Sequence, residues 1–149
     1  MPDKRKHLLC DVLVIGSGAA GLRAAVSARE KGLDVLVISK GTPGKGTCTF
    51  LSGGVFAGTR EGVPTDRHLA RTLQAGRGIN QQALAEILVE EGPMRLKEVV
   101  EWGMNAEFYR GYLFAKGRPP VWGEAIVYCL LAKSKALGIR FMDRLLVSN

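Results

Sequence analysis

A glycine-rich hexapeptide between two short apolar runs constrains the fold of this chain more than any other feature. Residues 16–21 read GSGAAG, which satisfies the pattern GxGxxG. The four aliphatic residues at 12–15 form the near-continuous apolar run of a parallel strand that is covered on both faces. The segment 22–31 is rich in helix-forming residues, and a second aliphatic run follows at 35–38. This order predicts a strand, a helix and a second strand parallel to the first.

The three glycines of the motif have different steric roles in such a unit. Gly16 permits the tight turn after the strand, Gly18 lets a pyrophosphate approach the main chain, and Gly21 lets the helix pack close to the strand. The N–H groups at the start of the helix then suit an anionic diphosphate. The predicted phosphate-binding residues of this dinucleotide site are Gly16, Ser17, Gly18, Ala19, Ala20 and Gly21.

The end of the second predicted strand helps to distinguish among dinucleotides. An Asp or Glu is usually expected there, where it binds the ribose hydroxyls of NAD. This chain has Ser39 and Lys40 instead. Because a serine can make only part of that contact, an NAD-dependent dehydrogenase fragment is the weaker alternative.

Length and composition describe an ordinary α/β protein. The chain has 149 residues, of which 46% are hydrophobic and 23% are charged, and this length suits one domain with a real core. The net charge of +7 comes from scattered basic residues, so we expect a solvated basic surface and no nucleic-acid partner. No apolar run approaches the roughly 20 residues that span a bilayer.

The cysteines bear on the redox compartment and on metal binding. Cys10, Cys48 and Cys129 are far apart and in no CxxC spacing. This pattern disfavours a disulfide framework and a metal site, and it favours a reducing, cytoplasmic location.

The segment 41–58, GTPGKGTCTFLSGGVFAG, is the second distinctive feature. It is too rich in Gly, Thr and Ser to predict a regular element and too apolar to predict a solvated linker. Together with IGSGAAGL and VISK, it resembles the N-terminal part of the succinate dehydrogenase and fumarate reductase flavoprotein family, which includes L-aspartate oxidase. The resemblance implies an α/β fold with a Rossmann-like, FAD-binding βαβ unit, a parallel sheet and added helices.

The resemblance also implies where FAD would lie. The motif at 16–21 would hold its pyrophosphate, and Ser39 and Lys40 would lie near the ribose. In respiratory members a histidine bonds covalently to the flavin at the position of Thr47. A threonine hydroxyl cannot form that bond, so we expect non-covalent FAD, with Cys48 as a small buried residue. The residues expected along the ribityl chain and the ring system are Thr47, Cys48, Thr49, Ser52, Gly53 and Gly54.

The remaining chain predicts mainly helices. We expect a helix over 66–77 capped by Thr65 or Asp66, and a helical stretch after a capping Asn80 that is either divided or bent at Pro93. The aromatic, basic and proline-containing segment 108–122 predicts an irregular loop. A helix over 124–137 and a strand over 139–147 follow, and the strand should join the first sheet as its third parallel member. By resemblance, the main chain near Leu146 and Val147 would contact the adenine.

The resemblance covers nearly the whole chain but only the first part of a family member. The family's substrate-binding histidine, its proton-donating arginine and its second flavin-binding segment have no counterpart here. We therefore expect a flexible tail at 1–9 and, over 10–149, the N-terminal part of an incomplete FAD-binding domain.

Such a portion would contain no catalytic residue and would be inactive alone. A second polypeptide or a C-terminal part would complete it, and peripheral membrane association through other subunits is compatible with this interpretation. Full-length family members transfer a hydride between a flavin and a dicarboxylate, and the resemblance implies this reaction for the ancestry of the chain only. The alternative is a non-catalytic nucleotide-binding or interaction module that kept the βαβ unit.

Overall fold

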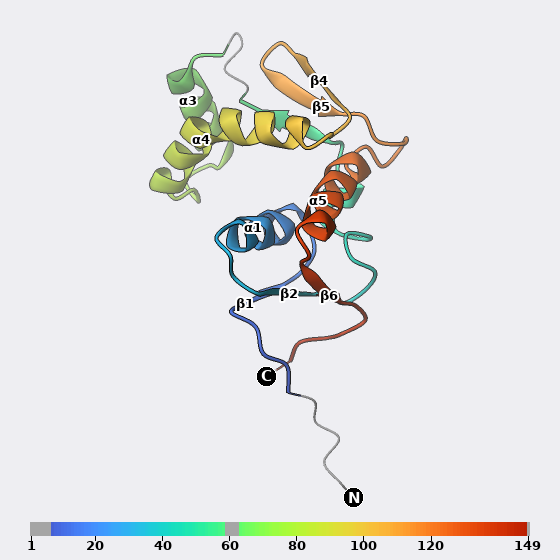
Figure 1. Ribbon diagram of the computed structural model, residues 1–149. Coiled ribbons are helices and arrows are strands. Elements are labelled where there is room, and N and C mark those ends of the chain that lie inside the picture. The colour runs from blue at the N-terminus through green and yellow to red at the C-terminus, as the bar shows by residue number, and fades with distance from the viewer. Residues whose placement is uncertain (1–6, 59–62, 149) are drawn as a thin grey trace, which may run out of the picture. The chain divides into compact units, whose positions relative to one another are not determined.

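The computed structural model describes residues 7–58 and 63–148, which fall into two compact units (Figure 1). One unit comprises Met1–Thr47 and Leu130–Asn149, and the other comprises Cys48–Cys129. Most of the tail predicted at 1–9 lies outside the described residues. Residues 7–9 are exposed and belong to no helix or strand.

The first unit contains a parallel sheet of three strands in the order β1-β2-β6. These are β1 (Val12–Ile15), β2 (Val35–Ile38) and β6 (Arg140–Met142). Val12 pairs with Val35, and Leu36 pairs with Arg140. The predicted βαβ unit and the third parallel strand are therefore confirmed, but β6 is shorter than the strand predicted over 139–147.

Helix α1 (Ala19–Glu30) connects β1 to β2 and lies along one face of this sheet (Figure 1). Its contact face consists of Leu22, Ala25 and Val26, which are fully buried. Gly32 follows the helix with φ of +84°, the left-handed conformation expected after a helix end. Burial of this apolar face fixes α1 against the two strands that flank the glycine motif.

The second unit combines helices with an antiparallel sheet in the order β3-β5-β4. Its strands are β3 (Val55–Ala57), β4 (Ala106–Tyr109) and β5 (Tyr112–Ala115), and its helices are α2 (Cys48–Leu51), α3 (Thr65–Ala75) and α4 (Gln82–Glu101). Helix α5 (Glu124–Ala136) begins in this unit and ends in the first. None of the helices within the described residues is long and apolar enough to cross a membrane.

The prediction of an irregular loop over 108–122 is wrong, because this segment contains most of a β-hairpin. Tyr109 pairs with Tyr112 across a two-residue turn, in which Arg110 and Gly111 have φ of +49° and +82°. Two successive positive φ values are typical of a type I′ turn, whose twist matches that of the strands. Leu113 is buried beside the exposed Tyr112, which is the alternation of a half-buried strand.

The segment 41–58 also contains regular structure, because α2 and β3 lie within it. The predicted caps are wrong: Pro64 precedes α3, and Gln81 precedes α4, without a side-chain capping bond. The Asn80 amide instead donates a hydrogen bond to the carbonyl of Thr72 at 3.1 Å. Helix α4 is one continuous helix with Pro93 inside it.

Substitution of two leucines in the second unit tests which residues form its core. Leu113 is 0% exposed and Leu84 is 60% exposed. We expect Leu113→Ala to lower the free energy of unfolding by about 2–5 kcal/mol, because it leaves a cavity. Leu84→Ala should change it by less than about 0.5 kcal/mol. Urea unfolding followed by circular dichroism measures both, and equal effects would contradict this placement of the core.

Candidate flavin site

The loop between β1 and α1 has the backbone that a diphosphate site requires. Gly16 follows β1 with φ of +105°, and its N–H donates to the carbonyl of Ile38 at 2.8 Å. Gly18 is extended immediately before α1, and its carbonyl accepts a hydrogen bond from the N–H of Leu22 at 3.0 Å. The helix therefore begins inside the glycine motif. The N–H groups of a first helical turn have no partner within the helix, and the helix dipole favours an anion there.

Gly21 shows why the third glycine of the motif is needed. A Cβ at this position would overlap the carbonyl oxygen of Gly16 and would lie 3.3 Å from Cγ1 of Val14. Any larger residue would push α1 away from the end of β1. The close approach of helix and strand predicted from the motif is therefore present.

Ser17 connects the glycine loop to the segment after β2. Its side chain is buried, and its Oγ accepts a hydrogen bond from the N–H of Gly44 at 2.8 Å. The hydroxyl of Thr47 donates to the carbonyl of Gly44 at 2.8 Å. Two of the predicted site residues thus hold the N–H and the carbonyl of the same glycine.

Ser39 lies at the carboxyl end of β2 and is only 5% exposed. Its hydroxyl donates to the carbonyl of Gly41 at 2.5 Å, and its carbonyl accepts a hydrogen bond from the N–H of Leu145 at 3.1 Å. The hydroxyl oxygen can still accept a hydrogen bond from a ligand. Lys40, the next residue, is exposed.

The structure brings the predicted residues of the first unit to one edge of the sheet. The glycine motif follows β1, Ser39 follows β2, and the segment that contains Leu146 and Val147 follows β6. Because all three strands are parallel, these segments meet at their carboxyl ends, which is where open α/β sheets bind ligands. Leu146 is 75% exposed and Val147 is 48% exposed, and both lie beyond the strand.

The other predicted residues, Cys48, Thr49, Ser52, Gly53 and Gly54, belong to the second unit. Ser52 closes their loop, because its hydroxyl donates to the carbonyl of Thr49 at 2.8 Å and accepts from the N–H of Gly54 at 3.3 Å. The carbonyl of Gly54 accepts a hydrogen bond from the N–H of Ala115 at 2.7 Å. Cys48 is exposed, so its expected burial is wrong.

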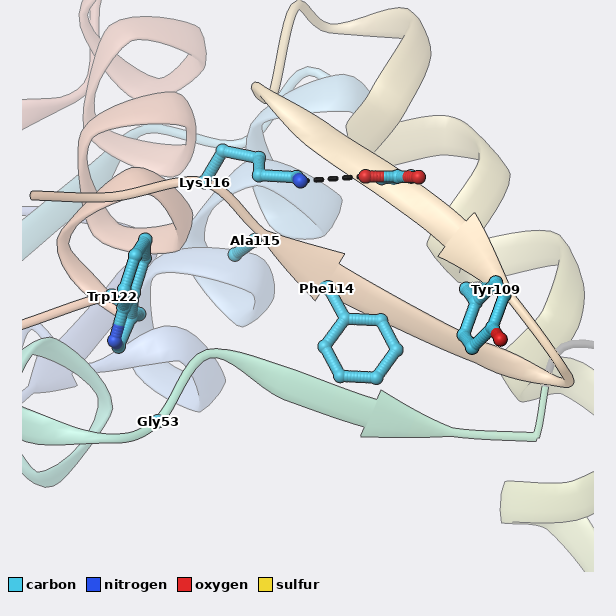
Figure 2. A pocket seen from close by; sticks show the side chains of 7 residues that line it. Gly53, Tyr109, Phe114, Ala115, Lys116 and Trp122 are labelled. Atoms are coloured by element: carbon cyan, nitrogen blue, oxygen red, sulfur yellow. Dashed lines mark ion pairs between the residues drawn. The ribbon is translucent and has the colours of Figure 1, made fainter.

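A hollow of about 490 Å³ adjoins this loop at Gly53. Figure 2 shows Trp122 at one end of the hollow and Tyr109 at the other, with Phe114 between them. The remaining lining residues are Glu107, Ala115 and Lys116. The sequence does not predict the residues that line this hollow, because it predicts an irregular loop for the segment that forms the hairpin.

One ion pair borders the hollow. Nζ of Lys116 lies 2.5 Å from Oε2 of Glu107 (Figure 2). The hydrogen bond from Lys116 holds the pKa of Glu107 below its ordinary value. The two opposite charges of this ion pair compensate each other beside the hollow.

Comparison with known proteins agrees with this geometry. A family model described as an FAD binding domain matches residues 11–149. The chain belongs to this family of FAD-binding domains. The fold class and the FAD cofactor predicted from the sequence are therefore confirmed.

Two curated relatives show which members of the family are similar. A fumarate reductase (CoM/CoB) subunit of Methanothermobacter marburgensis is 41% identical over 98 residues, which cover 63% of this chain and 18% of that protein. L-aspartate oxidase of Streptomyces coelicolor is 38% identical over 98 residues, which cover 66% of this chain and 17% of that protein. The chain thus spans less than a fifth of either relative.

Solved structures give the same result. The Sdh1 complex of Mycobacterium smegmatis superposes with a TM-score of 0.74 at 27% identity, over 91% of this chain and 27% of that chain. Quinol fumarate reductase of E. coli superposes with a TM-score of 0.78 at 21% identity, over 91% of this chain and 26% of that chain. The second likeness shows the fold alone. The chain corresponds to the N-terminal FAD-binding portion of succinate dehydrogenase and fumarate reductase flavoproteins.

Two glycine substitutions test the phosphate loop. An alanine Cβ at Gly21 would overlap the Gly16 carbonyl oxygen, whereas one at Gly41 would meet nothing within 4 Å. We expect Gly21→Ala to weaken FAD binding by about tenfold or more, which is about 1.4 kcal/mol, because α1 must move. Gly41→Ala should change the affinity for FAD by less than about twofold, because its Cβ would contact no neighbouring atom. Flavin-fluorescence titration measures both, and equal affinities would show that the loop tolerates the displacement.

Proposed function

We propose that this chain forms the FAD-binding portion of a flavin-dependent oxidoreductase of the fumarate reductase and succinate dehydrogenase type. The observation that carries the proposal is the glycine loop, in which α1 starts directly against the end of β1 without an intervening side chain. The relative from Methanothermobacter marburgensis and the solved E. coli protein are named as fumarate reductases, and the relative from Streptomyces coelicolor is named as an L-aspartate oxidase. Residues 10–149 then act as the N-terminal part of a larger FAD-binding domain.

The residues present fit the diphosphate of FAD. The main chain at Gly18 carries no side chain, and the start of α1 supplies N–H groups and a favourable dipole. In this proposal Ser39 and Lys40 lie near the ribose, and the main chain near Leu146 and Val147 contacts the adenine. When bound, FAD supplies an isoalloxazine ring that accepts and donates a hydride.

The loop that leads to the flavin ring favours non-covalent attachment. Thr47 stands where respiratory relatives have the flavin-linked histidine, and its hydroxyl already donates to Gly44. Thr49 and the turn Ser52–Gly54 offer small side chains and main-chain groups to the ribityl chain and the ring. These residues bind and orient the cofactor.

Substrate chemistry belongs to the complete protein in this proposal. We infer hydride transfer between the flavin and a dicarboxylate, with substrate-binding and proton-donating groups supplied by a segment or subunit beyond the matched portion. Free thiols at Cys10, Cys48 and Cys129 favour a reducing, cytoplasmic location.

Colour and flavin titration test this function directly. Purified protein should be yellow or should become so when FAD is added. Colourless protein that does not bind added FAD would favour the non-catalytic module.

Gly18→Val should abolish FAD binding, because its branched side chain would occupy the space of the pyrophosphate. Gly92→Val is a matched control, since a Cβ at Gly92 meets nothing within 4 Å, and it should bind FAD as the original chain does. Titration of both proteins, with circular dichroism to verify folding, measures the effect. If folded Gly18→Val protein kept its affinity for FAD, this result would show that the diphosphate does not bind at this loop.

Acid precipitation of the FAD-loaded protein should release all of its flavin into the supernatant, because Thr47 cannot form the covalent bond. Absorbance of the supernatant and the pellet at the flavin maximum measures the division. Flavin in the washed pellet would refute non-covalent attachment. The variant Cys48→Ser would then show whether the exposed thiol is the point of attachment.

A further inference from the structure

Glu124, the first residue of α5, is a buried carboxylate that is not among the predicted flavin-binding residues. It is 4% exposed, and buried carboxylates require hydrogen-bonding partners. Within residues 7–58 and 63–148, Arg118 supplies three hydrogen bonds to this carboxylate. Its main-chain N–H and its Nε donate to Oε1 at 2.9 and 2.7 Å, and its Nη2 donates to Oε2 at 3.1 Å.

This pair closes the turn that leads into α5. The N–H of Val121 donates to the carbonyl of Arg118 at 2.8 Å, and the N–H of Glu124 donates to the carbonyl of Val121 at 3.1 Å. The hydrogen bonds from Arg118 also hold the pKa of Glu124 below its ordinary value. The carboxylate is therefore ionised at neutral pH, and the bidentate contact persists there.

The closed turn brings Trp122 and Gly123 into contact with the predicted flavin loop. The N–H of Gly123 donates to the carbonyl of Ser52 at 3.0 Å. A Cβ at Gly123 would overlap the carbonyl oxygen of Thr49, and one at Gly54 would lie 3.0 Å from the carbonyl carbon of Trp122. The main chains of the two segments thus touch without a side chain between them.

A second contact joins α5 to α2, the helix that precedes Ser52–Gly54 of the predicted flavin loop. Tyr128, one turn further along α5, packs edge-on against Phe50 of α2 at 6.1 Å between ring centroids. The pKa of Arg118 is raised mainly by its hydrogen bond to Glu124, with a smaller contribution from Tyr128. The guanidinium therefore lies near both of these α5 side chains.

We propose that Glu124 and Arg118 are positioning residues for the flavin ring. By closing the turn 118–124, they hold Trp122 and Gly123 against Ser52–Gly54 and so fix the shape of the segment that meets the ring. Trp122 and Gly53 line the same hollow (Figure 2), so the pair also sets the position of the indole. The inference rests on the proposed function and extends it to residues that do not themselves contact the cofactor.

The two ends of the cofactor can be probed separately. ADP carries the diphosphate and adenosine but no flavin ring, so it probes the glycine loop without the ring. Glu124→Gln removes the charge of the carboxylate, and Arg118→Gln removes the guanidinium at a side chain that is 80% exposed. Glu91→Gln, which removes an exposed ion pair with Arg95 on α4, is the control.

We expect Glu124→Gln and Arg118→Gln to raise the Kd for FAD by about tenfold, as the loss of a charge-assisted hydrogen bond does, and to leave the Kd for ADP unchanged. Glu91→Gln should change neither. In a Trp102→Phe background, the emission of Trp122 should shift to longer wavelength in both variants. Arg118→Gln keeps the test available if Glu124→Gln fails to fold.

Two results would overturn the inference while leaving the proposed function intact. One is unchanged FAD affinity and unchanged Trp122 emission in Arg118→Gln, with the original chain still binding FAD. The other is an equal loss of FAD and ADP affinity, which would indicate a general structural role. If the original chain binds ADP but not FAD, the proposed function itself fails.

Discussion

The close approach of α1 to the end of β1 is the constraint on which the first unit depends. Gly21 lies so near the carbonyl of Gly16 that only a hydrogen atom fits between them. This contact lets Leu22 and Val26 reach the sheet, where both are fully buried. The same contact determines where the first N–H groups of the helix lie. Packing and the proposed phosphate recognition therefore have one steric cause.

Hydrogen bonds within the loops arrange the rest of the carboxyl edge. Ser17 holds Gly44, and the main chain of Ser39 bonds to Met142 through its N–H and to Leu145 through its carbonyl. A loop that is already ordered loses less conformational entropy when a ligand binds. In the proposed function these residues would support cofactor binding even where they do not touch the cofactor, which is why serine and threonine are useful beside the glycines.

The parts of the fold that the sequence revealed are those with local signals. The βαβ unit combines apolar runs, a glycine pattern and a fixed spacing within one short stretch, and the structure has each element where these signals place it. The hairpin had a signal too, in the alternation around Leu113 and the turn at Arg110–Gly111, but its aromatic and basic composition outweighed that signal. Asn80 failed as a cap because its amide bonds to Thr72 of the preceding helix. The contact of Gly123 with Ser52 joins residues far apart in the sequence, and no local pattern encodes it.

The exposed fraction of the carboxylate distinguishes the Glu124 pair from the ion pairs that Arg95 makes on α4. Arg95 bonds to Glu91 and Glu98 with its side chain 43% exposed, and such surface pairs contribute little to stability. Glu124 is different because its carboxylate is enclosed while its arginine remains in solvent. Removal of the arginine side chain takes away two of the three donors of a buried carboxylate, and opening of the turn toward water is one way to relieve this. A turn that opens no longer holds Trp122 against Gly54, which is how the pair would act on the geometry of the predicted flavin loop.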